Sequence, residues 1–149
     1  MNSAAKIGRI DMAEIDDCRM HHIGYVVSSI EKSAPNFAKD ICATWDGRIF
    51  EDPHQVVRVT FLETQHPPGP LVELVQPNGD TSPVLNFLKR GGGLHHLCYE
   101  VKNLDLRLAY CNELGGKMVR PPRPAVAFGG RRIAWVFTPN RLLVEFLER

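Results

Sequence analysis

Two pairs of histidines and two glutamates are the residues of this chain whose types and spacing suggest chemistry. The segments His21–Val27 and His95–Val101 share the pattern His-His-apolar-small-Tyr-X-Val. A glutamate follows the second histidine of each pair at a similar distance, Glu73 after 51 residues and Glu145 after 49, each within an apolar run. Self-similarity of this kind indicates repeated structural units. The chain is therefore predicted to contain two similar units, each with a histidine on its first strand and a glutamate on its last.

Strand geometry decides which of these side chains can meet. Successive side chains of a strand point to opposite faces of the sheet, and we expect apolar residues on the face that the helices cover. The opposite, concave face then receives one histidine and one glutamate from each unit, namely His22, Glu73, His96 and Glu145. Taken singly, such a histidine is more often a hydrogen-bonded structural residue, and such a glutamate more often marks an exposed edge.

Four such residues in matching register favour a metal site over coincidence. A carboxylate in the middle of an apolar strand is costly to bury unless it is paired or bound to a metal. Two imidazoles and two carboxylates suit Co²⁺, Ni²⁺, Mn²⁺, Zn²⁺ or Fe²⁺. The sequence therefore predicts one divalent metal ion as cofactor and leaves its identity open.

Each unit is predicted to run as a strand, a helix and three further strands. The first unit is expected to have a strand at 20–27, a helix opened by Ser28 with Glu31 as a capping box, and strands near 48–50, 56–62 and 71–75. The second is expected to have a strand at 94–101, a helix capped by Asn103, and strands near 118, 132–138 and 142–147. One or two helical turns are expected at 83–88.

The size and composition of the chain are those of one globular domain. It has 149 residues, of which 44% are hydrophobic and 23% charged. The predicted fold class is α+β, with two tandem βαβββ modules that form a curved mixed sheet around a concave metal site. Residues 1–19 are expected to be an N-terminal extension and residues 20–149 a single domain, with module one at about 20–77, a linker at 78–93 and module two at about 94–149.

Composition argues against several classes of partner. Eighteen basic and 17 acidic residues give a net charge of +1, so neither nucleic acid nor a membrane surface is expected as a partner. No apolar run approaches the ~18 residues that cross a bilayer, and the first 20 residues lack the apolar core of a secretory signal. The four cysteines show no Cys-X-X-Cys pair and no zinc-finger spacing, which favours free thiols and a cytoplasmic location.

The motifs together resemble the vicinal oxygen chelate superfamily, which includes glyoxalase I, extradiol dioxygenases and the fosfomycin- and bleomycin-resistance proteins. The resemblance spans about residues 20–149 and is carried by His21–Gly24, Val72–Pro77, the segment 82–88 leading to Gly93–His96, and Leu143–Glu145. Within the superfamily the chain looks most similar to methylmalonyl-CoA epimerase and its relatives. The resemblance implies that His22, Glu73, His96 and Glu145 are the metal ligands, and that His21 and His95 point to the opposite face as structural residues.

The resemblance also implies an enzyme. We expect a metal-dependent isomerase or epimerase that abstracts a proton α to a carbonyl of a small molecule such as an acyl thioester, and that forms a homodimer. One alternative is a lyase of the glyoxalase I type, which Glu73 favours because some epimerases carry glutamine there. Another is a non-catalytic, resistance-type protein that binds a small molecule, which the intact ligand set disfavours. An iron-dependent ring-cleaving dioxygenase is less favoured because it needs open coordination positions.

Roles in the reaction follow from the same resemblance. Glu145 is the first candidate for the base, as a ligand that loosens when substrate binds, and Glu73 is its counterpart in the other unit. Arg58 stands where some epimerases carry a glutamate, which argues against a second base there. Phe128 stands where epimerases usually carry a histidine, which makes the pocket wall more apolar. The residues predicted to contact the substrate are Arg58, Thr60, Glu100, Phe128 and Arg132.

Overall fold

The computed structural model describes residues 12–66 and 69–149. Its helices are α1 (Met12–Ile15), α2 (Ile30–Asp40), α3 (Leu85–Lys89) and α4 (Leu104–Glu113), with a 3₁₀ turn, η1, at Val126–Phe128. Its strands are β1 (Cys18–Val26), β2 (Ala43–Trp45), β3 (Phe50–Asp52), β4 (Val57–Thr64), β5 (Leu71–Pro77), β6 (Gly93–Val101), β7 (Lys117–Pro124), β8 (Arg132–Phe137) and β9 (Leu143–Glu148).

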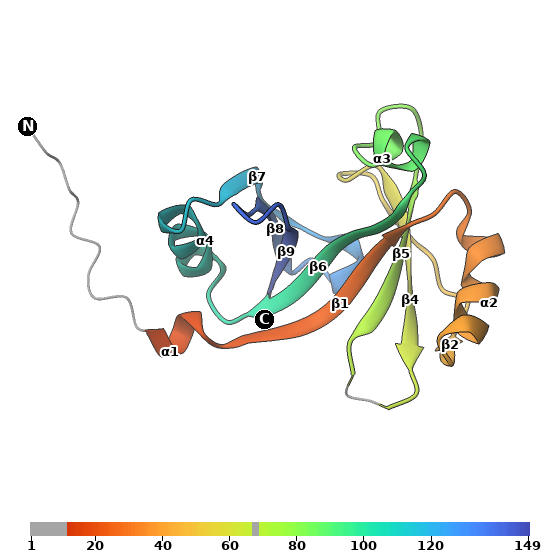
Figure 1. Cartoon of the computed structure of the whole chain (residues 1–149), viewed down its shortest axis with the longest axis horizontal. Coiled ribbons are helices and arrows are strands. Elements are labelled where there is room, and N and C mark those ends of the chain that lie inside the picture. The colour runs from red at the N-terminus through yellow and green to blue at the C-terminus, as the bar shows by residue number, and fades with distance from the viewer. Residues whose placement is uncertain (1–11, 67–68) are drawn as a thin grey trace, which may run out of the picture.

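All nine strands of the described residues join one mixed sheet (Figure 1). The strand order is β2-β4-β5-β1-β6-β9-β8-β7, and β3 pairs with β4. β1 and β6 run antiparallel through the middle, while β5 lies parallel to β1 and β9 lies parallel to β6. The first strand of each module therefore lies beside the last strand of the same module. The predicted α+β fold is confirmed, and the sheet stays open at β2 and β7.

Polar caps begin both long helices. The side chain of Ser29 accepts a hydrogen bond from the backbone N–H of Lys32, and Asn103 accepts one from that of Leu106. Each cap satisfies a backbone donor that the first helical turn leaves unpaired. The predicted cap at Asn103 is confirmed, whereas the predicted cap at Ser28 is wrong by one residue. Two short strands, β2 and β3, replace the single strand predicted near 48–50.

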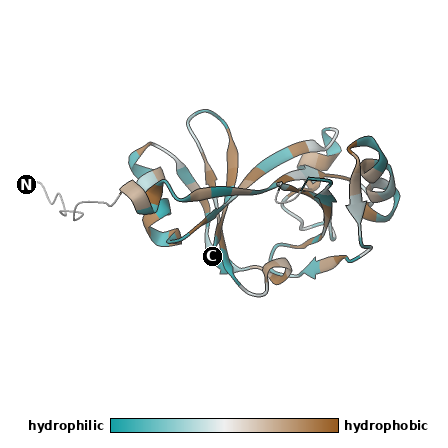
Figure 2. Ribbon diagram, turned by 90° about the horizontal axis from the view of Figure 1, so that it is seen from below, coloured by the Kyte–Doolittle hydropathy of each residue, from teal (hydrophilic) through white to brown (hydrophobic). Residues whose placement is uncertain are grey.

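The helices cover one side of the sheet and bury the apolar core there. α2 packs Ile30 against Leu62 and Leu74, and all three are fully buried. α4 packs Leu104 into a cluster with Phe146. Full burial of one such side chain stabilises the fold by about 1.5–3 kcal/mol. In Figure 2, hydrophobic and hydrophilic residues alternate along the central strands, as expected where only one face meets the helices. The other face remains for the site.

The segment before the first module packs on module two. Ile15 of α1 is buried, and its carbonyl accepts a hydrogen bond from Arg107 of α4. Arg149 near the end of β9 forms an ion pair with Asp17. β1 begins at Cys18, two residues before the predicted strand. Within residues 12–66 and 69–149, no helix has the length and apolar character needed to cross a membrane.

Candidate metal centre

An irregularity in the two central strands places both histidine pairs. β1 and β6 pair residue by residue except at two points, where the register skips His21 on β1 and His95 on β6. An extra residue of this kind is a β-bulge, which bends the strand and re-aims its side chains. The two bulges fall at equivalent positions of the two modules, each directly before the histidine predicted to bind the metal.

The bulges overturn the expectation that His21 and His95 point to the opposite face. Nδ1 of His21 lies 2.8 Å from Nδ1 of His22, and Nδ1 of His95 lies 2.9 Å from Nδ1 of His96. His95 also lines the same cavity as His96. Side chains alternate strictly only along an unbroken strand, so a rule that ignores bulges fails at both pairs.

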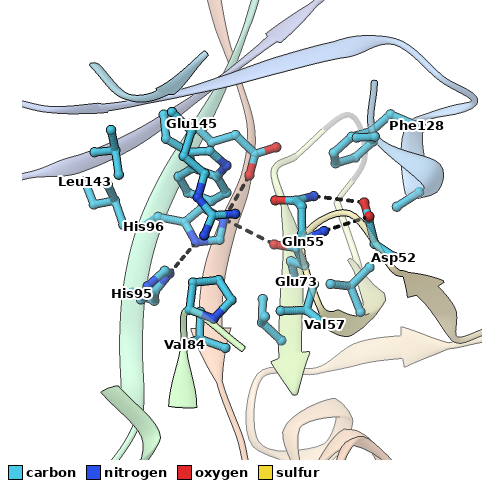
Figure 3. A pocket seen from close by; sticks show the side chains of 18 residues that line it. Asp52, Gln55, Val57, Glu73, Val84, His95, His96, Phe128, Leu143 and Glu145 are labelled. Carbon is cyan, nitrogen blue, oxygen red and sulfur yellow. Dashed lines mark hydrogen bonds and ion pairs between the residues drawn. The ribbon is translucent and has the colours of Figure 1, made fainter. Parts of the chain in front are cut away.

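The four predicted ligands meet at the centre of the sheet. Oε2 of Glu73 lies 3.2 Å from Nε2 of His22 and 3.1 Å from Nε2 of His96. Oε2 of Glu145 lies 3.8 Å and 3.4 Å from the same two nitrogens. All four ligand atoms lie within 4.8 Å of one another, and no ligand residue is more than 5% exposed. Figure 3 shows His96, Glu73 and Glu145 pointing toward one another.

Burial and contact separate the two carboxylates electrostatically. Burial would raise the pKa of Glu73, but the imidazoles of His22 and His96 hold that pKa well below its usual range. Burial raises the pKa of Glu145 to about 8; His22 opposes this rise only in part, and the negative charge of Glu73 adds to it. Without a metal, Glu145 is therefore the carboxyl that keeps its proton near neutral pH.

The histidines differ in the same way. Burial alone would lower the pKa of His22, but the adjacent Glu73 carboxylate raises that pKa above its ordinary value. Burial prevails at His96 and lowers its pKa. Burial also lowers the pKa of His21, and it lowers the pKa of His95 to about 4, with His96 contributing. His95 is therefore neutral at physiological pH and can accept a hydrogen bond at one ring nitrogen.

Gly24 makes room for the ring of His96. A Cβ at position 24 would lie 2.0 Å from Cε1 of His96 and 2.4 Å from its Nε2. Gly24 pairs with both Glu73 and His96 across the neighbouring strands. The equivalent position of module two is Cys98, which pairs with His22 and Glu145. The small third position of the repeated motif is therefore a requirement of the site in module one.

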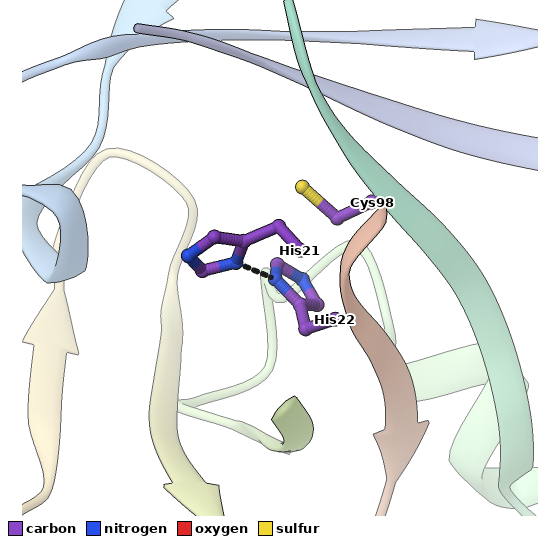
Figure 4. Close-up of side chains that lie close together, drawn as sticks. All are labelled: His21, His22 and Cys98. Atoms are coloured by element: carbon purple, nitrogen blue, oxygen red, sulfur yellow. Dashed lines mark hydrogen bonds between the residues drawn. The ribbon is translucent and has the colours of Figure 1, made fainter. Parts of the chain in front are cut away.

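The donor set fits a divalent metal ion. Oε1 of Glu145 is buried without a hydrogen-bond partner, and the two ligand histidines bring their Nε2 atoms to 3.1 Å. A buried carboxylate that lacks full compensation is costly, and a cation at this point would compensate both carboxylates. His22 also belongs to a second group of three candidate ligands with His21 and Cys98 (Figure 4). Burial raises the pKa of the Cys98 thiol, which disfavours the thiolate that metals bind.

Three of the four predicted ligands, Glu73, His96 and Glu145, form one wall of a cavity of about 170 Å³. On the facing wall Asp52, only 2% exposed, accepts hydrogen bonds from the backbone of His54 and from the backbone and side chain of Gln55 (Figure 3). Asp52 also accepts one from the backbone of Val126 in module two, so it joins the two modules at the cavity. The rest of the lining is mostly apolar, with Val57, Val59, Val75, Val84, Ala127, Phe128 and Trp135.

Two of the five predicted substrate contacts lie at or beside the cavity. Phe128 lines it, and its ring stacks on His22 with centroids 5.8 Å apart and planes at 20°. Glu100 does not line the cavity. Its Oε1 lies 3.8 Å from Nε2 of His21, and its Oε2 lies 3.4 Å from the guanidinium of Arg131. Glu100 is therefore a neighbour of the histidine pair and not a wall residue.

The structure turns Arg58 and Thr60 away from the cavity. β4 presents Val57 and Val59 to the cavity, so the residue after each of them, Arg58 and Thr60, faces the helix side. Arg58 forms an ion pair of 2.6 Å with Glu31 of α2. The hydroxyl of Thr60 is fully buried and accepts a hydrogen bond of 2.7 Å from the indole N–H of a tryptophan on β2. Neither Arg58 nor Thr60, both predicted to contact the substrate, lines the cavity.

Arg132 also lies outside the cavity. Its guanidinium binds Glu148 of β9 at 2.7 Å and Asp105 of α4 at 3.0 Å. These contacts connect two strands and a helix of module two, and Arg132, also predicted to contact the substrate, does not line the cavity.

Three cavity residues escaped prediction from the sequence. His95 was assigned to the wrong face. Trp135 places its ring edge-on to His96 with centroids 4.6 Å apart. Arg120 lines the cavity from the edge strand β7, and its side chain has no hydrogen-bond or ion-pair partner among residues 12–66 and 69–149. Arg120 lies between the short strand predicted near 118 and the prolines at 121 and 122, where no periodic pattern predicts the face of a side chain.

Comparison with known proteins identifies relatives over most of the chain. Residues 21–135 match the family model of the Glyoxalase/Bleomycin resistance/Dioxygenase superfamily. The chain is 28% identical over 131 residues to the ethylmalonyl-CoA/methylmalonyl-CoA epimerase of Cereibacter sphaeroides, covering 85% of this chain and 95% of that protein. It is 28% identical over 152 aligned positions to the mitochondrial methylmalonyl-CoA epimerase of Dictyostelium discoideum, covering 99% and 87%.

A solved structure supports the same fold. The methylmalonyl-CoA epimerase of Mycobacterium tuberculosis superimposes with a TM-score of 0.73, covering 87% of this chain and 86% of that one, at 22% identity. At this identity the superposition establishes the shared arrangement of strands and helices alone.

Proposed function

The chain belongs to the Glyoxalase/Bleomycin resistance/Dioxygenase superfamily, and from this premise we propose that it is a divalent-metal-dependent epimerase acting α to the carbonyl of an acyl thioester. The observation that carries the proposal is the group of four buried candidate ligands, three of which line a largely apolar cavity. The similarity to acyl-CoA epimerases over nearly the whole chain supports this reaction over the other chemistries of the superfamily.

The four ligands would hold the metal through Nε2 of both histidines and one oxygen of each carboxylate. When bound, a divalent metal acts as a Lewis acid that draws electrons from a carbonyl oxygen and so acidifies the neighbouring C–H. His22, Glu73 and His96 already lie close together, while Glu145 makes longer contacts. Glu145 is therefore the ligand that can most easily exchange its contact for another partner.

Glu145 is the proposed base. Its Oε1 has no partner, and an oxygen on the cavity wall can accept the proton from the α-carbon. The C–H bond breaks toward Oε1, the electron pair moves into the substrate carbonyl, and a proton returns to the opposite face of the carbon. Glu73 comes from the equivalent position of the other module and is the candidate for delivering that proton, which it would first take up from solvent because the imidazoles of His22 and His96 otherwise hold it ionised. The apolar walls exclude water, so that a new C–H bond forms from the protein.

Arg120 is the proposed contact for an anionic group of the substrate. It pairs with Trp135 across β7 and β8, and Trp135 pairs with Glu145 across β8 and β9. Because Arg120 lies two strands away from Glu145, its backbone is about 10 Å from the backbone of Glu145. An arginine without a protein partner at this distance can bind a carboxylate or phosphate while the thioester carbonyl lies at the ligands. Cavity and charge thus support an anionic acyl thioester.

Metal content and proton exchange test the proposal together. Protein purified without chelator or affinity-column metal is expected to hold about one divalent ion per chain, and the His96→Ala variant is expected to hold none. In deuterated water the loaded wild type should incorporate deuterium at the α-carbon of methylmalonyl-CoA or ethylmalonyl-CoA, followed by mass spectrometry. His54→Ala, a change at an exposed histidine, serves as the control that retains both properties.

The other outcomes separate the alternatives. Metal binding without exchange, together with turnover of a glutathione hemithioacetal, would favour a glyoxalase I-type lyase. Absence of metal after incubation with Co²⁺, Ni²⁺, Mn²⁺ and Zn²⁺ would overturn the enzyme and favour a small-molecule-binding protein. The expected homodimer and cytoplasmic location belong to the same proposal. The exposed side chains of Met118 and Val119 on edge strand β7 support a dimer, which light scattering in solution would measure.

A further inference from the structure

Each predicted ligand histidine is preceded by a second histidine that no metal contact requires. The two extra histidines occupy the β-bulges between β1 and β6, and their Nδ1 atoms lie 2.8 Å and 2.9 Å from Nδ1 of His22 and His96. Nε2 of each ligand histidine faces the carboxylates instead. The same arrangement therefore occurs twice: Nε2 of the ligand histidine faces the carboxylates, and its Nδ1 faces the imidazole of the preceding histidine.

We propose that His21 and His95 are positioning residues that fix the tautomer and ring orientation of the two metal-binding histidines. A histidine that binds a metal through Nε2 uses that lone pair and carries its proton on Nδ1. This Nδ1–H needs an acceptor, and in each module Nδ1 of the preceding histidine lies within hydrogen-bond distance, at 2.8 Å and 2.9 Å. Partners of this kind orient metal ligands and raise their basicity. The inference rests on the metal centre proposed above, not on the reaction.

In module one the chain of contacts continues one step further. When His21 accepts at Nδ1, its own proton lies on Nε2, and this atom faces Oε1 of Glu100 at 3.8 Å. Glu100 is held in turn by Arg131 at 3.4 Å. The ring of His21 is also fixed edge-on by Phe128, with centroids 5.4 Å apart. Glu100, predicted to contact the substrate, is thus assigned to the support of the ligand His22.

In module two aromatic rings take the place of that carboxylate. His95 packs edge-on against Phe87, with centroids 4.9 Å apart, and against Trp135 at 6.2 Å. Two different surroundings therefore hold the same histidine-to-histidine contact in the two modules. Because the surroundings of His21 and His95 differ, they do not explain why both modules have this histidine-to-histidine contact. What the two modules share is the ligand histidine that the contact supports.

Metal affinity tests this role without reference to turnover. The dissociation constant for Co²⁺ would be measured by chelator competition, with the visible absorption of bound Co²⁺ as a second readout, for wild type, His21→Leu, His21→Asn and His95→Leu. Leucine keeps apolar packing but cannot accept a hydrogen bond, whereas the Oδ1 of asparagine can take the place of Nδ1 as acceptor. His54→Leu changes an exposed histidine and is the control.

Each leucine variant is expected to bind Co²⁺ about 10–100-fold more weakly with a shifted absorption band. The asparagine variant is expected to regain most of that loss, and the control to match wild type. Unchanged affinity and spectrum in both leucine variants would overturn the inference while leaving the metal centre intact. Equal losses in the leucine and asparagine variants at position 21 would also overturn it, because packing alone would then matter. Absence of Co²⁺ from wild type would overturn the metal centre and this role together.

Discussion

Replacing Gly24 by alanine tests whether the position of the His96 ring creates the metal centre. The change adds one methyl group on β1, and that carbon would lie 2.0 Å from Cε1 and 2.3 Å from Nδ1 of His96. Carbon atoms in contact lie about 3.5–4.0 Å apart, so the ring must move by roughly 1.5 Å or more. Gly24 lies inside a strand with no positive φ, so alanine fits the backbone itself.

The size of the effect follows from the tolerance of metal coordination. Metal–nitrogen distances in proteins vary by only about 0.2 Å, so a displaced His96 no longer binds through Nε2. Disturbing a group behind a ligand costs about 10–100-fold in affinity, and displacement of the ligand itself should cost at least ~100-fold. Overpacking lowers the free energy of unfolding by about 1–3 kcal/mol. For a chain of this size Tm should therefore fall by about 2–12 °C.

The matched control is Gly116→Ala. A Cβ there would lie 2.9 Å from the carbonyl oxygen of Cys111 and 3.0 Å from Val136, so it also overpacks the structure, but far from the ligands. Chelator competition with Co²⁺ and thermal melting would be measured on both variants. We expect a lower Tm in both and a lost metal affinity only in Gly24→Ala. Wild-type affinity in Gly24→Ala would refute the assignment of His96 as a ligand in its present orientation.

Three further predictions concern charge. The pKa of Glu145 is raised from its ordinary value of 4.5 to about 8 in the folded, metal-free protein. The protonated Glu145 therefore stabilises the fold fully below about pH 4.5, and this stabilisation is lost as the pH rises toward 8. The raised pKa of His22 acts in the same direction. The lowered pKa values of His21, His95 and His96 act in the opposite direction below about pH 6.5, the ordinary pKa of histidine. The Tm of metal-free protein should therefore fall from about pH 6.5 to 8, and Glu145→Gln should flatten that fall; a Tm that rises over this range would contradict the burial of a protonated carboxyl. Arg120→Met should raise KM for an anionic acyl thioester at least ~10-fold, since a charge-assisted hydrogen bond contributes about 1.5–3 kcal/mol. Comparing the CoA thioester with a short-chain thioester that lacks phosphates would distinguish a carboxylate contact from a phosphate contact. An unchanged KM for both substrates would remove Arg120 from the site. Arg132→Met should leave metal affinity and KM within about twofold of wild type, because its partners lie outside the cavity; a large rise in KM would restore it as a substrate contact.

The internal repeat made the fold and the meeting of the four candidate ligands predictable from the sequence. Glu73 and Glu145 are polar residues inside apolar strands, and each follows a histidine motif at a similar distance, so one alternating pattern predicted the face of both. The structure brings all four predicted ligand atoms within 4.8 Å. A glutamate inside an apolar strand is an informative signal because a buried carboxylate is costly unless it is paired or bound to a metal.

The faces of His95 and Arg58 were not predictable in this way, for two different physical reasons. A β-bulge breaks the alternation at His95, and no residue type marks an extra residue that both neighbouring strands accommodate. Around Arg58 the apolar–polar alternation is present, but on β4 the apolar residues Val57 and Val59 face the cavity and not the helices. The expectation that apolar residues face the helices therefore fails at Arg58, which lies on the helix side and forms an ion pair with Glu31 of α2.

The two modules supply equivalent carboxylates, but their surroundings divide the work between them. Glu73 lies 3.1–3.2 Å from both ligand nitrogens, so it is held ionised and firmly placed. Glu145 lies 3.4–3.8 Å from them, keeps one buried oxygen without a partner, and has a pKa raised to about 8 by burial. Groups whose environments drive their pKa values apart are those that acid–base catalysis uses in different roles. The repeat thus explains why there are two carboxylates, and the departure from symmetry supports the proposal that Glu145 is the base once a bound metal has displaced its proton.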